Sequence, residues 1–501
     1  MKMELIHLES KDLSLDSQDK MPLAEALIRY SKEKVISFDV PGHKRGAQNN
    51  SLKDMLGSQA LRLDVNSMKE LDLLSHPESV IKEAQDLAAK AYGADAAYFL
   101  VNGTTVGILA MILTACKPND TLIVPRNAHK SVMNGIILSG ANPVFIQPEV
   151  DYHFGIAHGV SVESVKVTLE QHPNAKAIVI TYPTYFGSMT QLREICQLAH
   201  EKNVIVLVDS AHGAHLNFMD DYSEKAAIQA GADVVTVSMH KTGGSLTQSS
   251  LLLLTEKRIT REQLQKTLNM LQSTSASYLL MSSLDTARRD LVLYGFGKFR
   301  NLKSIVKKAI KRIEANNNYE VLNGSYLRKS YHQTFDWTKL VIRVNNIGLT
   351  GFEVYEILKK DYKIQVELAE GYCIMAVITT SDTYKSINSL VEALLDIENK
   401  FNKNRKLISK FVTTHEMNQL KISPREAYYA EHDVIPILES IGRISADSLM
   451  IYPPGIPLVI PGEIISSNVI EQYCFYQQTM GSVLTEAKKA NYITVIKESL
   501  I

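Results

Sequence analysis

Short apolar runs alternate with amphipathic segments through the middle of the chain, from about residue 78 to residue 290. The apolar runs have the length of buried strands. They are Ala96–Val101, Thr121–Val124, Pro143–Ile146, Ala177–Thr181, Val204–Val208 and Val234–Val237. Apolar residues recur at helical spacing in Glu78–Tyr92, before the first of these runs, and in the segments that follow Gly103 and Ser131. Strands that alternate with helices predict an α/β fold with a mostly parallel, doubly wound sheet.

A smaller α/β unit is predicted after the loop Asn316–Asn318. Its strands are Lys339–Val344, Gln365–Leu368 and Cys373–Thr379, and its helices are Phe352–Lys360 and Ser386–Phe401. The basic run Lys400–Lys406 has the composition of a linker, although it also fits a solvated helix end. A last unit carries Pro/Gly-rich stretches at Tyr452–Pro457 and Pro461–Glu463.

A chain of 501 residues is too long for one hydrophobic core, so it should divide into domains. We predict an N-terminal segment over residues 1–60 and a large domain over 61–300. A small α/β domain over 301–400 and a C-terminal domain over 401–501 follow.

Composition excludes several classes of function. Lysine and arginine together number 54, as do aspartate and glutamate, so no global field favours nucleic acid or an anionic membrane. No apolar run approaches the roughly 20 residues that span a bilayer, and the polar start lacks the pattern of a signal peptide. The four cysteines are far apart and form no CxxC pair. We therefore expect a cytoplasmic protein with reduced thiols and no zinc site.

Two predicted strands lead into residues capable of chemistry. Val204–Val208 is followed by Asp209, and Val234–Val237 is followed closely by Lys241. Ligands of open α/β sheets bind at the carboxyl ends of strands. Pyridoxal phosphate (PLP) needs a lysine for its Schiff base and a carboxylate for its pyridine nitrogen, and these strand ends supply both. Taken singly, the lysine also fits a solvated surface residue, and the aspartate also fits a helix N-cap.

The strand-to-helix junction Asn102–Thr105 offers backbone N–H groups and hydroxyls, which suit a phosphate, although a simple cap has the same composition. His129 also follows a predicted strand, where its ring fits stacking on a flat cofactor or a structural role equally well. His212 and His215 form an HxxH pair, but no third clustered ligand supports a metal site. The absence of GxGxxG and GxxxxGK[ST] disfavours a dinucleotide or P-loop nucleotide.

Together these residues resemble the Orn/Lys/Arg decarboxylase family, a PLP-dependent branch of fold type I with the architecture of aspartate aminotransferase. The chain is most similar to shorter bacterial members that lack a wing domain. The motifs that carry the resemblance are Pro41–Lys44, Asn102–Thr105, Arg126–Ser131, Thr181–Gly187, Val208–His215, Ser238–Ser250, Tyr452–Pro457 and Pro461–Glu463. They span nearly the whole chain, so the resemblance also implies an appended C-terminal α+β domain.

The resemblance implies a role for each matched position. Lys241 would hold PLP as a Schiff base, Asp209 would pair with the pyridine nitrogen and His129 would stack on the ring. Lys241 or His240 would return a proton to Cα, so the expected catalytic residues are Lys241, His240 and His129. The remaining cofactor-binding residues, near the phosphate or beside the ring, would be Gly103, Thr104, Thr105, Ser238, His240, Ala211 and His212.

The family also implies a homodimer with active sites at the interface, or a higher oligomer, in which Ser273–Tyr278 reaches the phosphate of the partner. The expected reaction is decarboxylation of a basic amino acid to an amine of polyamine biosynthesis, with arginine favoured over lysine and ornithine. Another PLP reaction, transamination or elimination, and a catalytically decayed regulatory homologue are the alternatives.

The chain departs from the family pattern at two places. Ser210 stands where close relatives usually have a glutamate. Leu73 and Ser75 replace an acid and a histidine, unless His76 substitutes for that histidine after a shift of one residue. These changes affect the substrate preference if the two segments read the distal cationic end of the substrate. Glu463 and Glu367 are further candidates for that end by their acidity, although a solvated surface role is favoured for both.

Overall fold

The computed structural model describes residues 15–49, 51–401, 417–451, 456–479 and 483–497. Two features singled out in the sequence fall partly outside these ranges. They are the first four residues of Tyr452–Pro457 and all but the first two residues of the predicted linker Lys400–Lys406.

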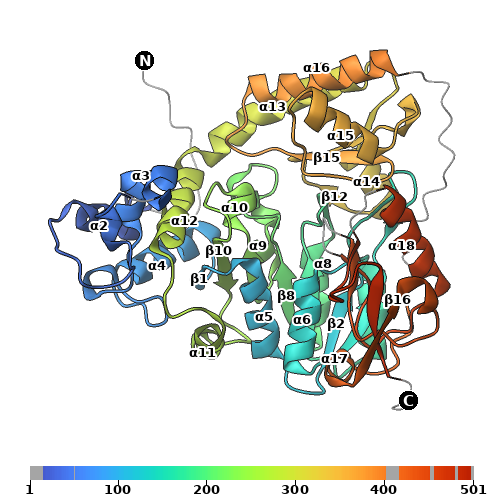
Figure 1. The fold of residues 1–501 in the computed structure, drawn as a ribbon, viewed down its shortest axis with the longest axis horizontal. Coiled ribbons are helices and arrows are strands. Elements are labelled where there is room, and N and C mark those ends of the chain that lie inside the picture. The colour runs from blue at the N-terminus through green and yellow to red at the C-terminus, as the bar shows by residue number, and fades with distance from the viewer. Residues whose placement is uncertain (1–14, 50, 402–416, 452–455, 480–482, 498–501) are drawn as a thin grey trace.

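A seven-stranded sheet forms the centre of the molecule, in the order β1-β10-β9-β8-β6-β2-β3 (Figure 1). The strands are β1 (Ala96–Leu100), β2 (Thr121–Pro125), β3 (Asn142–Ile146), β6 (Ala177–Thr181), β8 (Ile205–Asp209), β9 (Val234–Val237) and β10 (Ser250–Leu254). From β9 to β3 all neighbours pair in parallel, whereas β10 runs antiparallel to both β1 and β9. The predicted mostly parallel α/β sheet is confirmed, but strand β10 was not predicted.

Helices cover both faces of this sheet because its strands are apolar on both sides. In β6, Ile178 and Ile180 belong to one hydrophobic cluster and Val179 to another, as the alternation of side chains along a strand requires. The first cluster includes α4 (Val80–Tyr92), α8 (Leu192–Glu201) and α12 (Tyr278–Asp290). The second includes α5 (Gly103–Ala115), α6 (Lys130–Ser139) and α11 (Arg261–Leu271), so the large unit has three layers.

The smaller unit has an antiparallel sheet in the order β11-β13-β15-β14. Its strands are β11 (Glu320–Val321), β13 (Lys339–Arg343), β14 (Leu368–Ala369) and β15 (Cys373–Val377). Helices α13 (Phe296–Ile313), α15 (Gly351–Asp361) and α16 (Tyr384–Lys400) pack on it (Figure 1). The strand predicted at Gln365–Leu368 is shorter and later, since pairing with β15 begins only at Leu368.

The C-terminal unit is α+β, as predicted, and lies beside the large sheet (Figure 1). Its described residues form two small sheets and two α-helices. Its elements are α17 (Pro424–Tyr429), β16 (His432–Pro436), β17 (Leu449–Ile451), β18 (Ile456–Val459), α18 (Ser467–Thr479), β19 (Val483–Leu484) and β20 (Tyr492–Ile496).

A buried ion pair fastens the C-terminal unit to the large unit. Arg126 Nη2 lies 2.9 Å from Glu463 Oε2, and the two side chains are 7% and 0% exposed. The same guanidinium donates hydrogen bonds to the carbonyl oxygens of Pro457 and Leu458. A second ion pair between the units, Lys130–Glu486 at 2.5 Å, is far more exposed.

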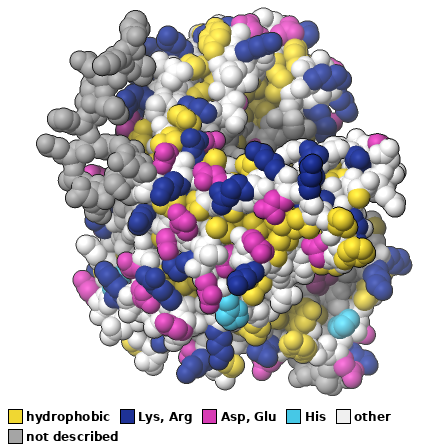
Figure 2. Space-filling model, turned by 90° about the vertical axis from the view of Figure 1, so that its left-hand side faces the viewer, with side chains coloured by type: hydrophobic (Ala, Val, Ile, Leu, Met, Phe, Trp, Pro, Cys, Tyr) yellow, Lys and Arg dark blue, Asp and Glu magenta, His cyan; other side chains and the backbone are white. Residues whose placement is uncertain are grey.

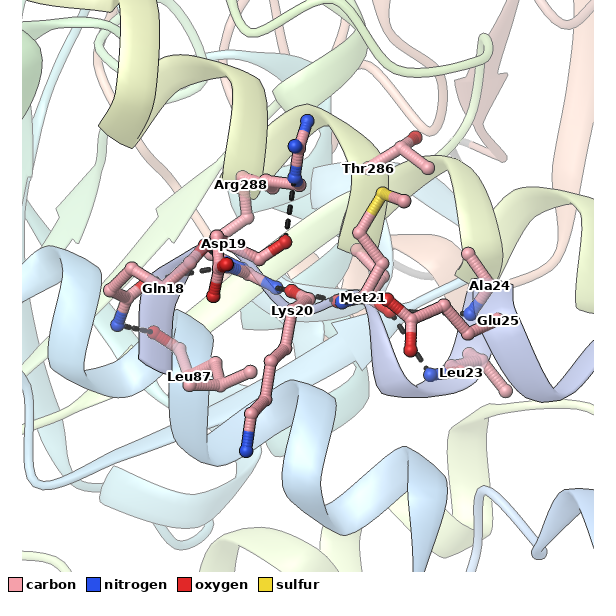
Figure 3. A network of polar contacts seen from close by, with 12 residues as sticks. Gln18, Asp19, Lys20, Met21, Leu23, Ala24, Glu25, Leu87, Thr286 and Arg288 are labelled. Carbon is pink, nitrogen blue, oxygen red and sulfur yellow. Dashed lines mark hydrogen bonds and ion pairs between the residues drawn. The ribbon is translucent and has the colours of Figure 1, made fainter. Parts of the chain in front are cut away.

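The N-terminal segment is anchored on α12 by two neighbouring charged side chains (Figure 3). The Arg288 guanidinium donates to the carbonyl oxygens of Gln18 and Lys20. Asp285 pairs with Arg288 and accepts the N–H groups of Leu23 and Ala24 at the start of α2 (Pro22–Lys32). A carboxylate on another helix therefore satisfies the free N–H groups of the α2 N-terminus.

Within the described ranges, none of the helices has both the length and the apolar character needed to cross a membrane.

The Arg126–Glu463 pair makes a testable contribution to stability. Glu463→Gln leaves the Arg126 charge buried without a counter-ion, so the free energy of unfolding should fall by about 3–5 kcal/mol. Glu486→Gln is the matched control, because it breaks an exposed bridge between the same units and should cost less than about 1 kcal/mol. Urea unfolding of both variants measures the difference, and equal losses would contradict the assignment.

Candidate active site

A cavity of about 360 Å³ opens at the carboxyl ends of the parallel strands, where all three units meet. The large unit contributes Asp209 and Lys241, and the small unit contributes Glu367 and Glu370. The C-terminal unit closes the cavity with residues of β17, β18 and α18. Six of the ten residues predicted to act in catalysis or cofactor binding line it: Thr104, His129, Asp209, Ala211, His212 and Lys241.

Lys241 lies on the short helix α10 (Met239–Thr242), which begins two residues after β9 ends. Its Nζ is 3.0 Å from His212 Nε2. Solvent reaches the side chain through the cavity, yet the protein around the amine lowers its pKa by desolvation; Asp209 and Glu367 oppose this effect and Lys339 adds to it. A lowered pKa makes the neutral, nucleophilic amine more available near neutral pH.

Asp209 is the last residue of β8 and is 4% exposed. Its Oδ1 accepts the N–H of Ala211 at 3.1 Å. The strand leads into a turn rather than into an α-helix, so the alternative interpretation of Asp209 as a helix N-cap is wrong. The carboxylate is instead held at the strand end, at the wall of the cavity.

His212 is buried between Lys241 and an aromatic ring. The Tyr185 ring contacts it edge-on, with the ring centroids 4.5 Å apart. Burial lowers the pKa of His212 well below its ordinary value, and the nearby Lys241 and Lys339 lower it further. The imidazole is therefore neutral, and its Nε2 can accept a hydrogen bond from the Lys241 amine.

His129 has the structural role that its sequence position allowed, and it also borders the cavity. It caps α6, since its Nδ1 accepts the N–H of Ser131 at 3.2 Å, and it also lines the cavity. Burial lowers its pKa, with Asp209 acting in the opposite direction. One ring nitrogen is thus used structurally, which fixes the neutral ring as the Nε2-protonated form.

The residues expected near a phosphate surround the N-terminus of α5. Gly103 has φ +72°, and Thr104 Oγ1 lies 3.2 Å from Ser238 Oγ. Ser238 is fully buried, whereas Thr105 is exposed. His240 Nδ1 donates to the carbonyl oxygen of Ser249 at 3.1 Å. Gly103, Thr105, Ser238 and His240 therefore lie behind or beside the cavity rather than in its wall.

The two histidines of the HxxH pair face different partners. His212 contacts Lys241, whereas His215 Nε2 lies 3.1 Å from Asp336 Oδ2 and 3.0 Å from Thr338 Oγ1. The two rings therefore do not converge on one point. Among the residues that the structure describes, no group of three or more metal-ligating side chains occurs.

His215 belongs to a fully buried ionic cluster that the sequence did not reveal. Lys339 Nζ lies 3.3 Å from Asp336 Oδ2, and it also donates to the carbonyl oxygen of His212 at 3.5 Å. Burial acts to raise the pKa of Asp336, but Lys339 and His215 outweigh it and hold that pKa below its ordinary value. Burial lowers the pKa of His215.

The site also corrects two ideas about substrate selection. Glu463 is 0% exposed and paired with Arg126, so its interpretation as a reader of the substrate is wrong, and so is the alternative of a solvated surface group. Ser210 is 2% exposed and does not line the cavity. Tyr185, Arg126 and Glu370 also line the cavity, but the sequence did not single them out as site residues. Tyr185 and Arg126 lie within the family motifs Thr181–Gly187 and Arg126–Ser131, which could have indicated them, whereas Glu370 lies in none of the matched motifs.

Comparisons with known proteins agree with this geometry. A family model described as the Orn/Lys/Arg decarboxylase major domain matches residues 21–386, and one for the C-terminal domain matches residues 405–483. The chain is 42% identical to an arginine decarboxylase of Bacillus anthracis, over 91% of this chain and 92% of that protein. It is 40% identical to the arginine decarboxylase of Bacillus subtilis, over 96% and 99% of the two chains.

Solved structures give the same fold at lower identity. The lysine decarboxylase of Francisella novicida superposes with a TM-score of 0.82 at 21% identity, over 96% of this chain and 82% of that one. The constitutive lysine decarboxylase of Escherichia coli gives a TM-score of 0.80 at 20% identity, over 97% and 83%. The predicted fold type I architecture is confirmed.

The buried histidines predict loss of stability in acid. His129, His212, His215 and His240 all have lowered pKa values, so the folded protein keeps them neutral while the unfolded chain binds protons below the ordinary value of 6.5. Their contribution is complete above pH 6.5 and declines as the pH falls, by up to about 1.4 kcal/mol per histidine and pH unit. Urea unfolding at pH 7.5 and 5.5 measures the slope.

Two variants test which histidines cause that slope. His215→Gln should reduce the pH dependence, because one buried site of differential protonation is removed. His432→Gln, at an exposed position on β16, should leave it unchanged. An unchanged slope in His215→Gln would refute the explanation for His215.

Proposed function

Because this chain belongs to the Orn/Lys/Arg decarboxylase family, we propose that it uses PLP to remove CO2 from a basic amino acid, with arginine favoured over lysine and ornithine. One observation carries the proposal. The Lys241 amine and the Asp209 carboxylate line a single cavity at the carboxyl edge of the sheet, together with His129. This is the place where open α/β sheets bind ligands.

The chemistry of the cavity residues fits PLP. Lys241 offers an amine of lowered pKa to the aldehyde, and Asp209 offers a carboxylate to the pyridine nitrogen. The buried His212 Nδ1 has no hydrogen-bond partner among the described residues, so a polar group is needed beside it. The N-terminus of the 13-residue helix α5, with the Thr104 hydroxyl, suits a phosphate.

The proposed roles follow from these positions. PLP, when bound, supplies the electron sink that accepts the electron pair left by departing CO2. Asp209 keeps the pyridine nitrogen protonated, which strengthens that sink. His212 accepts a hydrogen bond from the Lys241 amine across their 3.0 Å contact and so orients that amine. Lys241 is therefore best placed to reprotonate Cα, ahead of His240, whose Nδ1 is committed to Ser249.

Selection of a basic amino acid is supported by the relatives and by the charge of the cavity. Both Bacillus relatives are named arginine decarboxylases. Glu367 and Glu370 line the cavity, and a cationic side chain would balance their negative charge. The amine product would enter reactions that build polyamines.

Self-association is supported by an exposed apolar patch on the side of the molecule where α2 and α3 (Ser51–Leu63) lie. Phe38 is 93% exposed and Ile36 is 84% exposed, and Val40, Met55 and Leu73 are further exposed apolar side chains of the N-terminal part of the chain. Figure 2 looks onto this side and shows hydrophobic side chains exposed between charged ones. A second copy of the chain would cover such a patch, and we propose a homodimer with Ser273–Tyr278 near the interface.

The cysteines support a reducing, cytoplasmic setting. Cys116, Cys196, Cys373 and Cys474 are all free thiols, and three of them are buried. Burial raises the pKa of Cys116 to about 12, which makes that thiol unreactive.

The assignment of Lys241 is tested by absorbance and product analysis. Purified protein with PLP should show the yellow band of a lysine-bound cofactor and should convert arginine to agmatine and CO2 in equal amounts. Lys241→Ala should lose the band and at least about 10³-fold in rate, since the covalent anchor and the proton carrier are both removed. Amine formation without CO2 from arginine, lysine and ornithine would refute decarboxylation.

The proposed dimer is tested by sedimentation velocity. Phe38→Asp replaces the most exposed of these apolar side chains with a charge, so the dimer dissociation constant should rise at least about tenfold. Tyr384→Asp is the control, because Tyr384 is 64% exposed on α16, away from the patch. Equal effects of the two changes would argue against the patch as the interface.

A further inference from the structure

Two carboxylates of the cavity wall form no close ion pair among the residues that the structure describes, although Glu367 acts on the charge of Lys241 from a distance. Glu367 directly precedes β14, and Glu370 lies in the turn between β14 and β15. Their side-chain hydrogen bonds come from tyrosines: Tyr185 donates to Glu367 at 2.7 Å and Tyr476 donates to Glu370 at 3.3 Å. Arg126, the cation of the cavity wall other than Lys241, is already paired with Glu463.

The two carboxylates differ in their contact with water. Glu367 is an exposed residue, whereas Glu370 is only partly exposed and its carboxyl group is surrounded by protein. Desolvation raises the pKa of Glu370 to about 7, although Tyr476 acts to lower it. A carboxylate removed from water gains much more from a bound cation than one that water already screens. Glu370 is therefore the stronger candidate for substrate recognition.

The C-terminal unit places a polar helix face beside Glu370. Asn468, Gln472 and Tyr476 follow one another at intervals of four residues on α18, so they share one face, and all three line the cavity. A guanidinium has five N–H donors in a planar arrangement and can therefore use a carboxylate together with neighbouring polar groups. The ammonium group of lysine or ornithine is a more compact ion with three N–H donors, so it can form fewer hydrogen bonds with the surrounding polar groups.

We propose that Glu370, oriented by Tyr476, binds the distal guanidinium of the substrate and so determines selection of a cationic, arginine-like side chain. This assignment rests on the proposed function, because it names the residue that binds the side-chain end of the same amino-acid substrate. Glu370 is then kept in the cavity at a cost to the folded state, since its carboxylate is desolvated without a counter-ion until substrate binds.

The test compares agmatine, which carries the guanidinium, with N-carbamoylputrescine, its neutral ureido counterpart. Isothermal titration of the PLP-loaded protein measures both affinities without turnover. Glu370→Gln should weaken agmatine binding about 10- to 100-fold, the effect of losing one charged hydrogen-bond partner, and should change ureido binding less than about threefold. Glu367→Gln, the matched control on the same hairpin, should change agmatine binding less than about fivefold.

A stability measurement separates recognition from a structural role. Glu370→Gln should unfold at the same or a higher urea concentration than the wild type, because the substitution removes a desolvated charge. A merely structural carboxylate would instead lower the midpoint. If the Gln variant does not fold, Glu370→Met provides the same comparison with a neutral side chain of similar length.

The outcomes distinguish failure of the role of Glu370 from failure of the decarboxylase function. Unchanged agmatine binding in the Glu370 variants, or a loss confined to Glu367→Gln, overturns the role of Glu370 and leaves the decarboxylase assignment intact. If the wild type binds neither ligand and releases no CO2 from arginine, lysine or ornithine, the proposed function fails. Loss of agmatine binding with unchanged ureido binding and retained stability supports the proposal.

Discussion

The buried contact of Asp336, Lys339 and His215 is the constraint on which the geometry of the cavity depends. Asp336 lies in the turn between β12 (Thr334–Phe335) and β13, and Lys339 is the first residue of β13, whereas His215 follows β8 of the large sheet. Lys339 also packs against Gly187: a Cβ there would lie 2.8 Å from Lys339 Cγ, and φ is +86°. One ionic cluster therefore holds two of the segments by which the large unit reaches the cavity, residues 181–187 and 210–215.

The same cluster shapes the electrostatics of the site. Lys339 contributes a fixed positive charge behind His212, and this charge lowers the pKa of both His212 and Lys241. Because Asp336 compensates Lys339 directly, the charge persists without a large penalty for burial. The ion pair that holds the small unit in place thus also favours a neutral amine at Lys241. Fold and reactivity share one cause here.

The sequence predicted the strands and the site residues that local patterns encode. Asp209 and Lys241 follow apolar runs directly, so their meeting at the carboxyl edge follows from parallel pairing alone. Strand β10 was missed because four leucines after a polar run do not distinguish a strand from a buried helix segment. Asp336 and Glu370 were missed for another reason. Their importance depends on partners more than 100 residues away, His215 and Tyr476, and no local period records such contacts.

Ser210 illustrates how a departure from a family pattern can mislead about specificity. It lies next to Asp209, yet its hydroxyl packs 2.3 Å from the position that a Cβ on Gly213 would occupy, under the turn and outside the cavity wall. A larger acid at this position would change the packing of the turn between Asp209 and His212 before it met a substrate. The serine at position 210 therefore affects the packing of the turn between Asp209 and His212. The carboxylates that we propose for charge recognition lie instead on the hairpin of the small unit, which the Asp336–Lys339 cluster holds against the large unit.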